Sequence, residues 1–332
     1  RAMARAADRL TVEERIERIT TIFTTFRNPD KETVLTPWRV VNIHLANTLG
    51  GWCFYDEQYN QPLSEPRWVE HGSVTAEVFS PNSHVLEINS KSGLYPLYVA
   101  YSIYRSLVKD QLFATESVKD ELALWDTVVA QNVFIICKTP MAKSITRRTL
   151  VGFRPARVNT RYFEDLINQI KNKPDNFINK VCRGKSYWKA NNDDHMKFDA
   201  VVGNPPYQEE NDSTRKPPIY HLFYDISCQL CHKVTFITPA RFLFRAGQTP
   251  KEWMDKMLNN EHFKVVRFYK RSAEVFDSVS IKGGVAIGYY DKDQNFGKIG
   301  FFSEYKELVS ILRKVKKHQE PNICELISSR GM

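Results

Sequence analysis

Six short apolar runs, separated by helical segments, constrain the fold of this chain more than any other feature of its sequence. The runs have the length of buried strands and cover residues 84–88, 132–137, 198–202, 233–238, 263–268 and 284–289. Most are separated by amphipathic segments of helical length, near residues 95–109, 161–172, 219–231 and 250–260. This alternation predicts an α/β fold, with a doubly wound, mostly parallel sheet covered by helices.

Two further helices are expected before the first of these strands. Residues 1–27 combine Arg and Glu with apolar residues at helical spacing, which are Leu10, Ile16, Ile19 and Phe23. This spacing predicts one amphipathic helix. The next helix would begin at Thr36 and Pro37, with the threonine as N-cap and the proline in the first turn, and would end at Gly50 and Gly51.

The charge balance and the cysteines narrow the class of protein. With 47 Lys and Arg against 38 Asp and Glu, the formal net charge is +9, which favours an anionic partner such as nucleic acid. No run approaches the roughly 18 apolar residues of a membrane helix, and the Arg-rich start lacks a signal-peptide hydrophobic region. We therefore expect a soluble, cytoplasmic protein.

Cys228 and Cys231 lack the second pair typical of a zinc site, so buried thiols are favoured over a metal site.

The loop after the strand at residues 198–202 carries the strongest chemical signal. It contains Asn204, Pro205, Pro206 and Tyr207. Two consecutive prolines fix φ and remove two backbone donors, so the loop is stiff and presents carbonyl acceptors. In α/β sheets ligands bind at the carboxyl ends of the strands, where this loop would lie. The alternative is a proline-rich turn in which Tyr207 only covers the core.

These residue types suit methyl transfer to an amino group on an aromatic ring. The lone pair of such a nitrogen is delocalised into the ring, which makes the nitrogen a poor nucleophile. The Asn204 side-chain carbonyl and the Pro205 backbone carbonyl can each accept one of its hydrogens and hold it in a more tetrahedral geometry. Tyr207 adds a flat aromatic face beside these acceptors.

A second loop of interest follows the first strand of the predicted sheet. Glu87 lies near the end of that strand, and a short polar turn that includes Asn89 and Gly93 then opens into a helix. An acidic strand end followed by a small-residue loop and a helix N-terminus is typical of sites for nucleotide-like cofactors. An ordinary strand-to-helix turn has a similar pattern.

The chain resembles the adenine-specific DNA methyltransferases of restriction–modification systems, in the gamma order in which the cofactor motif precedes the catalytic motif. Besides the Asn204 loop, three landmarks carry the resemblance. Residues 36–41 look like the N-terminal Thr-Pro motif, residues 237–243 like the strand and loop after the catalytic motif, and residues 275–287 like the segment whose aromatic packs against a flipped base. The resemblance implies a Rossmann-like, S-adenosylmethionine-dependent methyltransferase that acts on double-stranded DNA.

The resemblance also implies roles for individual residues. The catalytic residues would be Asn204, Pro205, Pro206 and Tyr207, and the extruded adenine would stack on Tyr207 and Phe276. S-adenosylmethionine would be bound by residues of three segments, which are Thr36, Pro37, Glu87, Asn89, Gly93 and Asn204. DNA phosphate would be contacted by Arg215 and Lys216, unless these belong only to a solvated surface loop.

The chain departs from the family pattern at two places, and three rival functions stay open. Lys91 stands where a glycine is usual, and the strand at 132–137 lacks the terminal acidic residue that binds the cofactor ribose. Release-factor glutamine methyltransferases share the Asn-Pro-Pro-Tyr loop, because a side-chain amide poses the same lone-pair problem. An RNA adenine methyltransferase would also fit these residues, and so would a catalytically inactive DNA-binding subunit.

The landmarks divide the chain into three parts. Residues 1–32 would form a helical segment, residues 33–291 the catalytic domain, and residues 292–332 a segment that leads to a target-recognition domain beyond Met332. A helix expected at residues 306–318 carries a basic cluster suited to phosphate. We expect a longer restriction–modification protein, with room for a nuclease or helicase, and weak, salt-dependent DNA binding by these residues alone.

Overall fold

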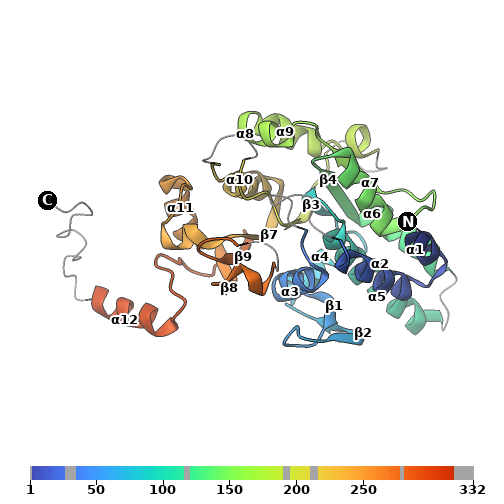
Figure 1. Ribbon diagram of the computed structural model, residues 1–332, viewed down its shortest axis with the longest axis horizontal. Coiled ribbons are helices and arrows are strands. Elements are labelled where there is room, and N and C mark those ends of the chain that lie inside the picture. Colours follow the sequence, from blue (N-terminus) through green and yellow to red (C-terminus); the bar gives the residue numbers. More distant parts are fainter. Residues whose placement is uncertain are drawn as a thin grey trace.

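The computed structural model describes residues 2–26, 35–115, 120–189, 195–209, 216–276 and 280–317. Its centre is a seven-stranded sheet with the order β5-β4-β3-β6-β7-β9-β8 (Figure 1). The strands are β3 (Val85–Ser90), β4 (Val133–Cys137), β5 (Asn159–Tyr162), β6 (Phe198–Gly203), β7 (Cys231–Pro239), β8 (Phe263–Tyr269) and β9 (Val285–Asp291). Strands β3 to β7 are parallel, and β9 runs antiparallel to β7 and β8. The predicted α/β fold with a mostly parallel sheet is confirmed.

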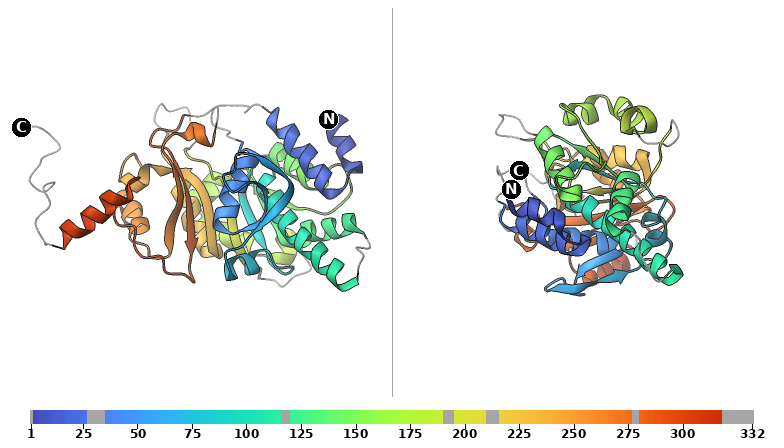
Figure 2. Two further views of the ribbon diagram at one scale, coloured as in Figure 1. Left: turned by 90° about the horizontal axis from the view of Figure 1, so that it is seen from below. Right: turned by 90° about the vertical axis from the view of Figure 1, so that its right-hand side faces the viewer.

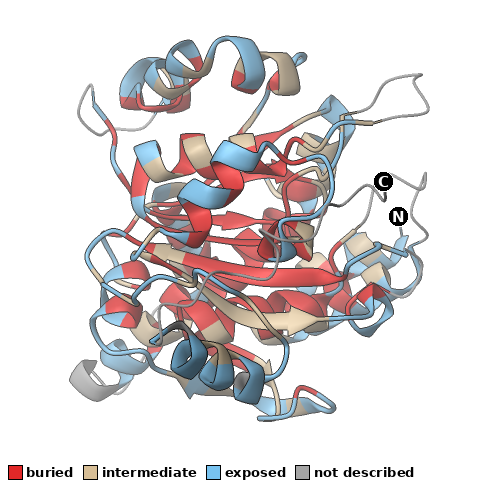
Figure 3. Cartoon of the chain, turned by 90° about the vertical axis from the view of Figure 1, so that its left-hand side faces the viewer, coloured by how far each residue is buried: buried red, intermediate tan, exposed pale blue. Residues whose placement is uncertain are grey.

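Helices cover both faces of this sheet, and most of its strand residues are buried, whereas the edge strand β8 is mostly half-buried (Figure 3). One face packs against α8 (Leu166–Asn172), α9 (Pro174–Val181), α10 (Tyr220–Leu230) and α11 (Lys251–Leu258). The other packs against α2 (Val12–Thr24), α3 (Trp38–Thr48), α4 (Ser73–Val78), α5 (Leu94–Thr115), α6 (Glu121–Asn132) and α7 (Pro140–Val151). Leu86 and Ile88 face the first set and Val85 the second, because successive side chains of a strand point to opposite faces.

All six predicted strands form, and the seventh strand corrects one predicted helix. The helix expected at 161–172 starts only at Leu166, because Arg161 and Tyr162 belong to β5. The β5 sequence is polar, and pairing with β4 at the sheet edge makes it a strand. A separate antiparallel hairpin, β1 (Gly51–Tyr55) with β2 (Pro62–Val69), was not predicted either. Helices α4, α6, α7 and α9 are likewise additions to the predicted elements.

The prediction of one continuous helix over residues 1–27 is wrong. The chain instead forms α1 (Ala2–Ala6), the short 3-10 turn η1 (Ala7–Arg9) and α2. The break occurs at Leu10 because Thr11 starts a new helix: its side chain accepts a hydrogen bond from Glu14 N, and the Glu14 carboxylate accepts one from Thr11 N. Ile16 and Ile19 of α2 are buried, as their spacing predicted.

The predicted N-cap of α3 is also wrong. Pro37 takes the N-cap position, and no side chain caps this helix. The Thr36 hydroxyl is therefore not used by the helix, and its partner lies in another part of the chain. The end of the helix at Gly50 is confirmed, since Gly50 N bonds back to Leu45 O and Gly50 has a positive φ of 86°.

The remaining elements lie mostly after β6. Two short 3-10 helices follow β6, which are η3 (Ala240–Phe244) and η4 (Ser272–Glu274). One π-helical turn, η2 (Gly184–Trp188), precedes β6. The predicted C-terminal helix forms as α12 (Lys306–Lys316), which projects from the body at the end opposite to α1 (Figure 2); His318 lies outside the described residues. None of the helices in the described segments has the length and apolar character needed to cross a bilayer.

Candidate active site

The two loops singled out in the sequence lie next to each other, at the point where the strand order reverses. The chain runs from β3 outward to β4 and β5, and then crosses back to β6 on the other side of β3. Ligands of open α/β sheets bind at such a switch point, outside the carboxyl ends of the strands. Glu87 of β3 pairs with Val202 of β6, so the loops that begin at Asn89 and Asn204 are neighbours.

Asn204 is held by a residue from the segment before α3. Its side-chain Nδ2 donates a 3.0 Å hydrogen bond to Thr36 Oγ1, and both residues are 7% exposed. The other end of the amide, Oδ1, is buried and has no hydrogen-bond partner among the described residues. A buried carbonyl without a donor is costly, so this oxygen marks a place where a ligand with an N–H group would fit.

Tyr207 lies beside this amide and is half-buried. Its hydroxyl is buried and, within the described segments, unpartnered. Burial raises the pKa of Tyr207 well above its ordinary value, so the hydroxyl stays protonated at neutral pH and cannot serve as a base. Ile219 N donates to Tyr207 O at 3.2 Å, and Gln208 forms an antiparallel bridge with Pro218.

The loop after β3 is pinned to α7, a helix that the sequence did not predict. Ser90 Oγ lies 3.1 Å from Thr146 Oγ1, and the Thr149 hydroxyl donates a 2.6 Å hydrogen bond to Ser92 O. Gly93 has a φ of +79°, and a Cβ there would lie 3.0 Å from Thr146 Cα. Glycine is therefore required at this position both by the backbone angle and by the close approach of α7.

Glu87 and Asn89 present two more unsatisfied polar groups at this loop. Glu87 is 6% exposed, and neither its Oε2 nor Asn89 Nδ2 has a partner in the described part of the chain. Burial raises the pKa of Glu87 to about 8, although the Ser90 side chain and the charge of Lys91 lower it. An acceptor and a donor side by side, both buried and unpaired, fit a polar ligand such as the nucleotide-like cofactor predicted here.

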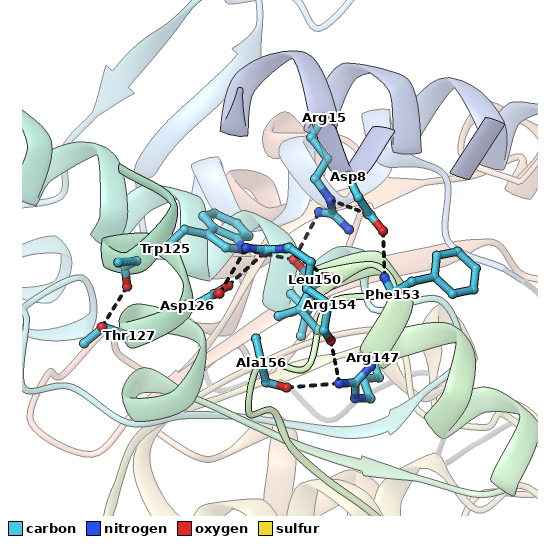
Figure 4. A network of polar contacts seen from close by, with 12 residues as sticks. Asp8, Arg15, Trp125, Asp126, Thr127, Arg147, Leu150, Phe153, Arg154 and Ala156 are labelled. Carbon is cyan, nitrogen blue, oxygen red and sulfur yellow. Dashed lines mark hydrogen bonds and ion pairs between the residues drawn. The ribbon is translucent and has the colours of Figure 1, made fainter. Parts of the chain in front are cut away.

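Helix α7 is in turn held by the N-terminal segment (Figure 4). The Arg15 guanidinium of α2 donates to the last carbonyls of α7: 2.7 Å to Arg148 O, 2.9 Å to Thr149 O and 3.0 Å to Leu150 O. Asp8 lies 3.5 Å from Arg15 Nε and accepts from Phe153 N at 2.8 Å. Burial lowers the pKa of Arg15 to about 10, so it remains charged at the carboxyl end of a helix dipole.

The other predicted site residues lie around this centre or outside the described segments. Pro37 is exposed beside Thr36, and Lys216 is half-buried beside the Gln208–Pro218 bridge, while Arg215 lies outside the described residues. Phe276 is 2% exposed and packs with residues of α3 and β9 in an apolar cluster. Stacking on a base would require this ring to be uncovered, so its role stays a prediction.

Three buried residues near the site gave no signal in the sequence. They are His44 of α3, Tyr95 of α5 and Thr235 of β7, and His44 forms a hydrogen bond with each of the other two. Partners 51 and 191 positions away cannot be identified from local pattern. No group of three or more His, Cys, Asp or Glu suited to a metal occurs in the described segments, and the five cysteines described there are free thiols.

Comparison with known proteins supports the sequence-based prediction. Residues 131–276 match the Eco57I restriction-modification methylase family. This methylase match includes β4, the Asn204 loop and Phe276, and covers less than half of the chain. Such a methylase requires a methyl donor. The gamma order and the roles of individual residues stay predictions.

The chain is also similar to individual proteins that are named as methylases or restriction-modification enzymes. An uncharacterized adenine-specific methylase of Mycoplasma pneumoniae is 32% identical over 95 residues, which cover 27% of this chain and 22% of that protein. A nuclease-deletion mutant of the Type ISP restriction-modification enzyme LlaGI, solved with a DNA substrate mimic, matches with a TM-score of 0.48 at 12% identity, over 86% of this chain and 29% of that one. A type I restriction-modification system methyltransferase subunit from Streptococcus thermophilus matches with a TM-score of 0.47 at 11% identity. The match covers 93% of this chain and 58% of that one.

Proposed function

We propose that this chain transfers a methyl group from S-adenosylmethionine to the exocyclic N6 amino group of adenine in double-stranded DNA, as part of a restriction–modification system. The observation that carries the proposal is the buried Asn204 Oδ1, unpartnered among the described residues, at the switch point between β3 and β6. The methylase match over residues 131–276 supports the reaction class, and the adenine-specific relative supports the base.

S-adenosylmethionine, when bound, supplies an electrophilic methyl group on a cationic sulfonium. Glu87 and Asn89 would hold this cofactor from the β3 loop, whose shape depends on Gly93 and on the packing of α7. Thr36 and Pro37 would contribute from the segment before α3. The chain has no acidic residue at the end of β4, where Cys137 is followed by Lys138.

The Asn204 loop would bind the target amino group. Asn204 Oδ1 and the Pro205 carbonyl would each accept one of its hydrogens, which keeps the nitrogen lone pair out of the ring and directed at the methyl group. Tyr207 would stack on the flipped adenine and repay part of the few kcal/mol lost in extruding it. Because Tyr207 stays protonated, no side chain of the loop removes a proton before transfer.

The test is a comparison of acceptors for the methyl group. The chain is incubated with methyl-labelled S-adenosylmethionine and duplex DNA, a matched RNA or a glutamine-bearing peptide, and products are analysed as nucleosides or amino acids. We expect label in N6-methyladenine from DNA. Label only in RNA or peptide would establish one of the rival methyltransferases. Cofactor binding without transfer to any acceptor would favour an inactive DNA-binding subunit.

A further inference from the structure

His44 is fully buried on α3, and both of its ring nitrogens are hydrogen-bonded. Nδ1 lies 2.7 Å from the Tyr95 hydroxyl, and Nε2 lies 2.7 Å from the Thr235 hydroxyl. Burial lowers the pKa of His44 to about 3, so the ring is neutral at physiological pH. A neutral imidazole donates through one nitrogen and accepts through the other.

The direction of these hydrogen bonds follows from a backbone carbonyl. The Thr235 hydroxyl donates to Gly288 O of β9 at 3.1 Å, and a carbonyl can only accept. The Thr235 oxygen therefore accepts from His44, which places the ring proton on Nε2. His44 Nδ1 is then the acceptor, and the Tyr95 hydroxyl must donate to it.

The same reasoning extends to Asn204. The Thr36 side chain lies close enough to the Tyr95 hydroxyl to lower the pKa of Tyr95 against the larger effect of burial. Because the proton of the Tyr95 hydroxyl is used by His44, a hydrogen bond between these two hydroxyls would have to run from Thr36 to Tyr95. Thr36 Oγ1 has then given up its proton and accepts from Asn204 Nδ2 at 3.0 Å. Donor and acceptor roles are then consistent from Gly288 to Asn204.

We propose that this buried relay holds the Asn204 amide in one of its two orientations, with Oδ1 facing the target amino group. The relay runs through Thr36, Tyr95, His44 and Thr235 to Gly288. The two ends of a carboxamide have nearly the same shape, so packing alone barely distinguishes them. A reversed amide would present Nδ2 hydrogens to the hydrogens of the substrate. His44, Tyr95 and Thr235 are thus positioning residues that touch no substrate.

The inference rests on the proposed function for the identity of the amino group, but not for the orientation of the amide. Tyr95→Phe breaks the relay in its middle. Tyr98→Phe is the matched control, because Tyr98 lies on the same helix, is equally buried, and donates its own 2.8 Å hydrogen bond to Gly50 O. Each substitution removes one buried hydroxyl, but only the Tyr95 hydroxyl belongs to the relay that reaches Asn204.

We expect Tyr95→Phe to lower the single-turnover rate of DNA methylation at saturating substrates about tenfold, which corresponds to about 1.4 kcal/mol. The KM values for DNA and S-adenosylmethionine should change much less, and Tyr98→Phe should leave the rate within about twofold. Thr36→Val, which removes the hydroxyl, should lose more of the rate than Thr36→Ser, which keeps it. Equal losses in Tyr95→Phe and Tyr98→Phe, or no loss in Tyr95→Phe, would overturn the proposal.

A measurement without turnover separates this inference from the proposed function. Nitrogen-15 NMR of histidine-labelled protein reports which ring nitrogen carries the proton, and the His44 signal is identified by its loss in His44→Gln. The relay predicts protonated Nε2 and unprotonated Nδ1 at neutral pH, with a shift of Nδ1 in Tyr95→Phe. A proton on Nδ1 would reverse the relay and refute it, even in an active enzyme; the predicted tautomer would support it even if DNA is not the acceptor.

Discussion

Asn204 Nδ2 and Thr36 Oγ1 form a 3.0 Å hydrogen bond across 168 positions of sequence. The bond joins the loop after β6 to the segment that precedes α3 and leaves Asn204 Oδ1 without a partner in the described segments. Substitutions at this oxygen, and at the groups that surround or support it, should therefore affect methyl transfer, cofactor binding and stability in different ways.

Asn204→Ala should reduce methylation by more than tenfold, because the variant lacks the acceptor proposed for the target amino group. A variant that keeps more than about a tenth of the turnover has lost less than about 1.4 kcal/mol, and that result would disprove the role. The Kd for S-adenosylmethionine, measured by calorimetry, should change little. Thermal unfolding of the variant serves as the control for a folding defect.

Glu87→Gln should alter the pH dependence of stability. The pKa of Glu87 is raised from 4.5 to about 8, so the folded chain binds this proton more tightly than the unfolded chain. The stabilisation from this group is fully present below about 4.5 and is lost as pH rises through about 8. The glutamine side chain of the variant is neutral at every pH. The Tm of the variant should therefore rise relative to that of the wild type as the pH increases toward 8. A difference that does not vary with pH above about 5 would show an ordinary carboxylate.

The same residue should matter more to the cofactor than to DNA. Removal of the Glu87 acceptor by Glu87→Ala should raise the Kd for S-adenosylmethionine while the Kd for duplex DNA changes less, because Glu87 is buried in β3 and does not lie on the surface. Both constants are measured at one salt concentration, since DNA affinity depends on salt. Equal losses of both would indicate general unfolding.

Tyr207→Ala should weaken the extruded base complex by roughly 1–3 kcal/mol, the range for stacking of a base on an aromatic side chain. Tyr207→Phe keeps the ring and is the matched control. A fluorescent adenine analogue at the target position should show reduced emission only with the alanine variant. Phe276→Ala should show a similar loss if its ring is uncovered on DNA binding, but also a lower Tm, because Phe276 is 2% exposed and its truncation leaves a cavity.

Arg15→Leu should lower the free energy of unfolding by about 2 kcal/mol, because the last carbonyls of α7 lose their donors. Arg18→Leu is the control, since Arg18 is exposed on the same helix and should contribute little. Denaturant unfolding measures both changes. A similar effect of the two substitutions would mean that the contacts of Arg15 with α7 do not stabilise the fold.

Local sequence determined most of the strands, the class of sheet and the turns of the two loops proposed to bind ligands. Apolar runs of strand length form β3, β4, β6, β7, β8 and β9. The central strands β3, β4, β6 and β7 are mostly apolar because helices cover both of their faces. The prolines after Asn204 and the glycine at position 93 mark turns through backbone angles that are themselves local properties. The order of the apolar runs along the chain was therefore enough to predict the sheet.

Tertiary structure alone decided which polar groups meet. The use of Thr36 by Asn204 instead of by α3, the pinning of the β3 loop by α7, and the contacts of His44 depend on residues that are far apart in sequence. Polar β5 became a strand only through pairing with β4, and Leu10 ended a helix because Thr11 began another. Hydrogen bonds between distant residues form only after the chain has packed, so periodicity and spacing carry no record of them.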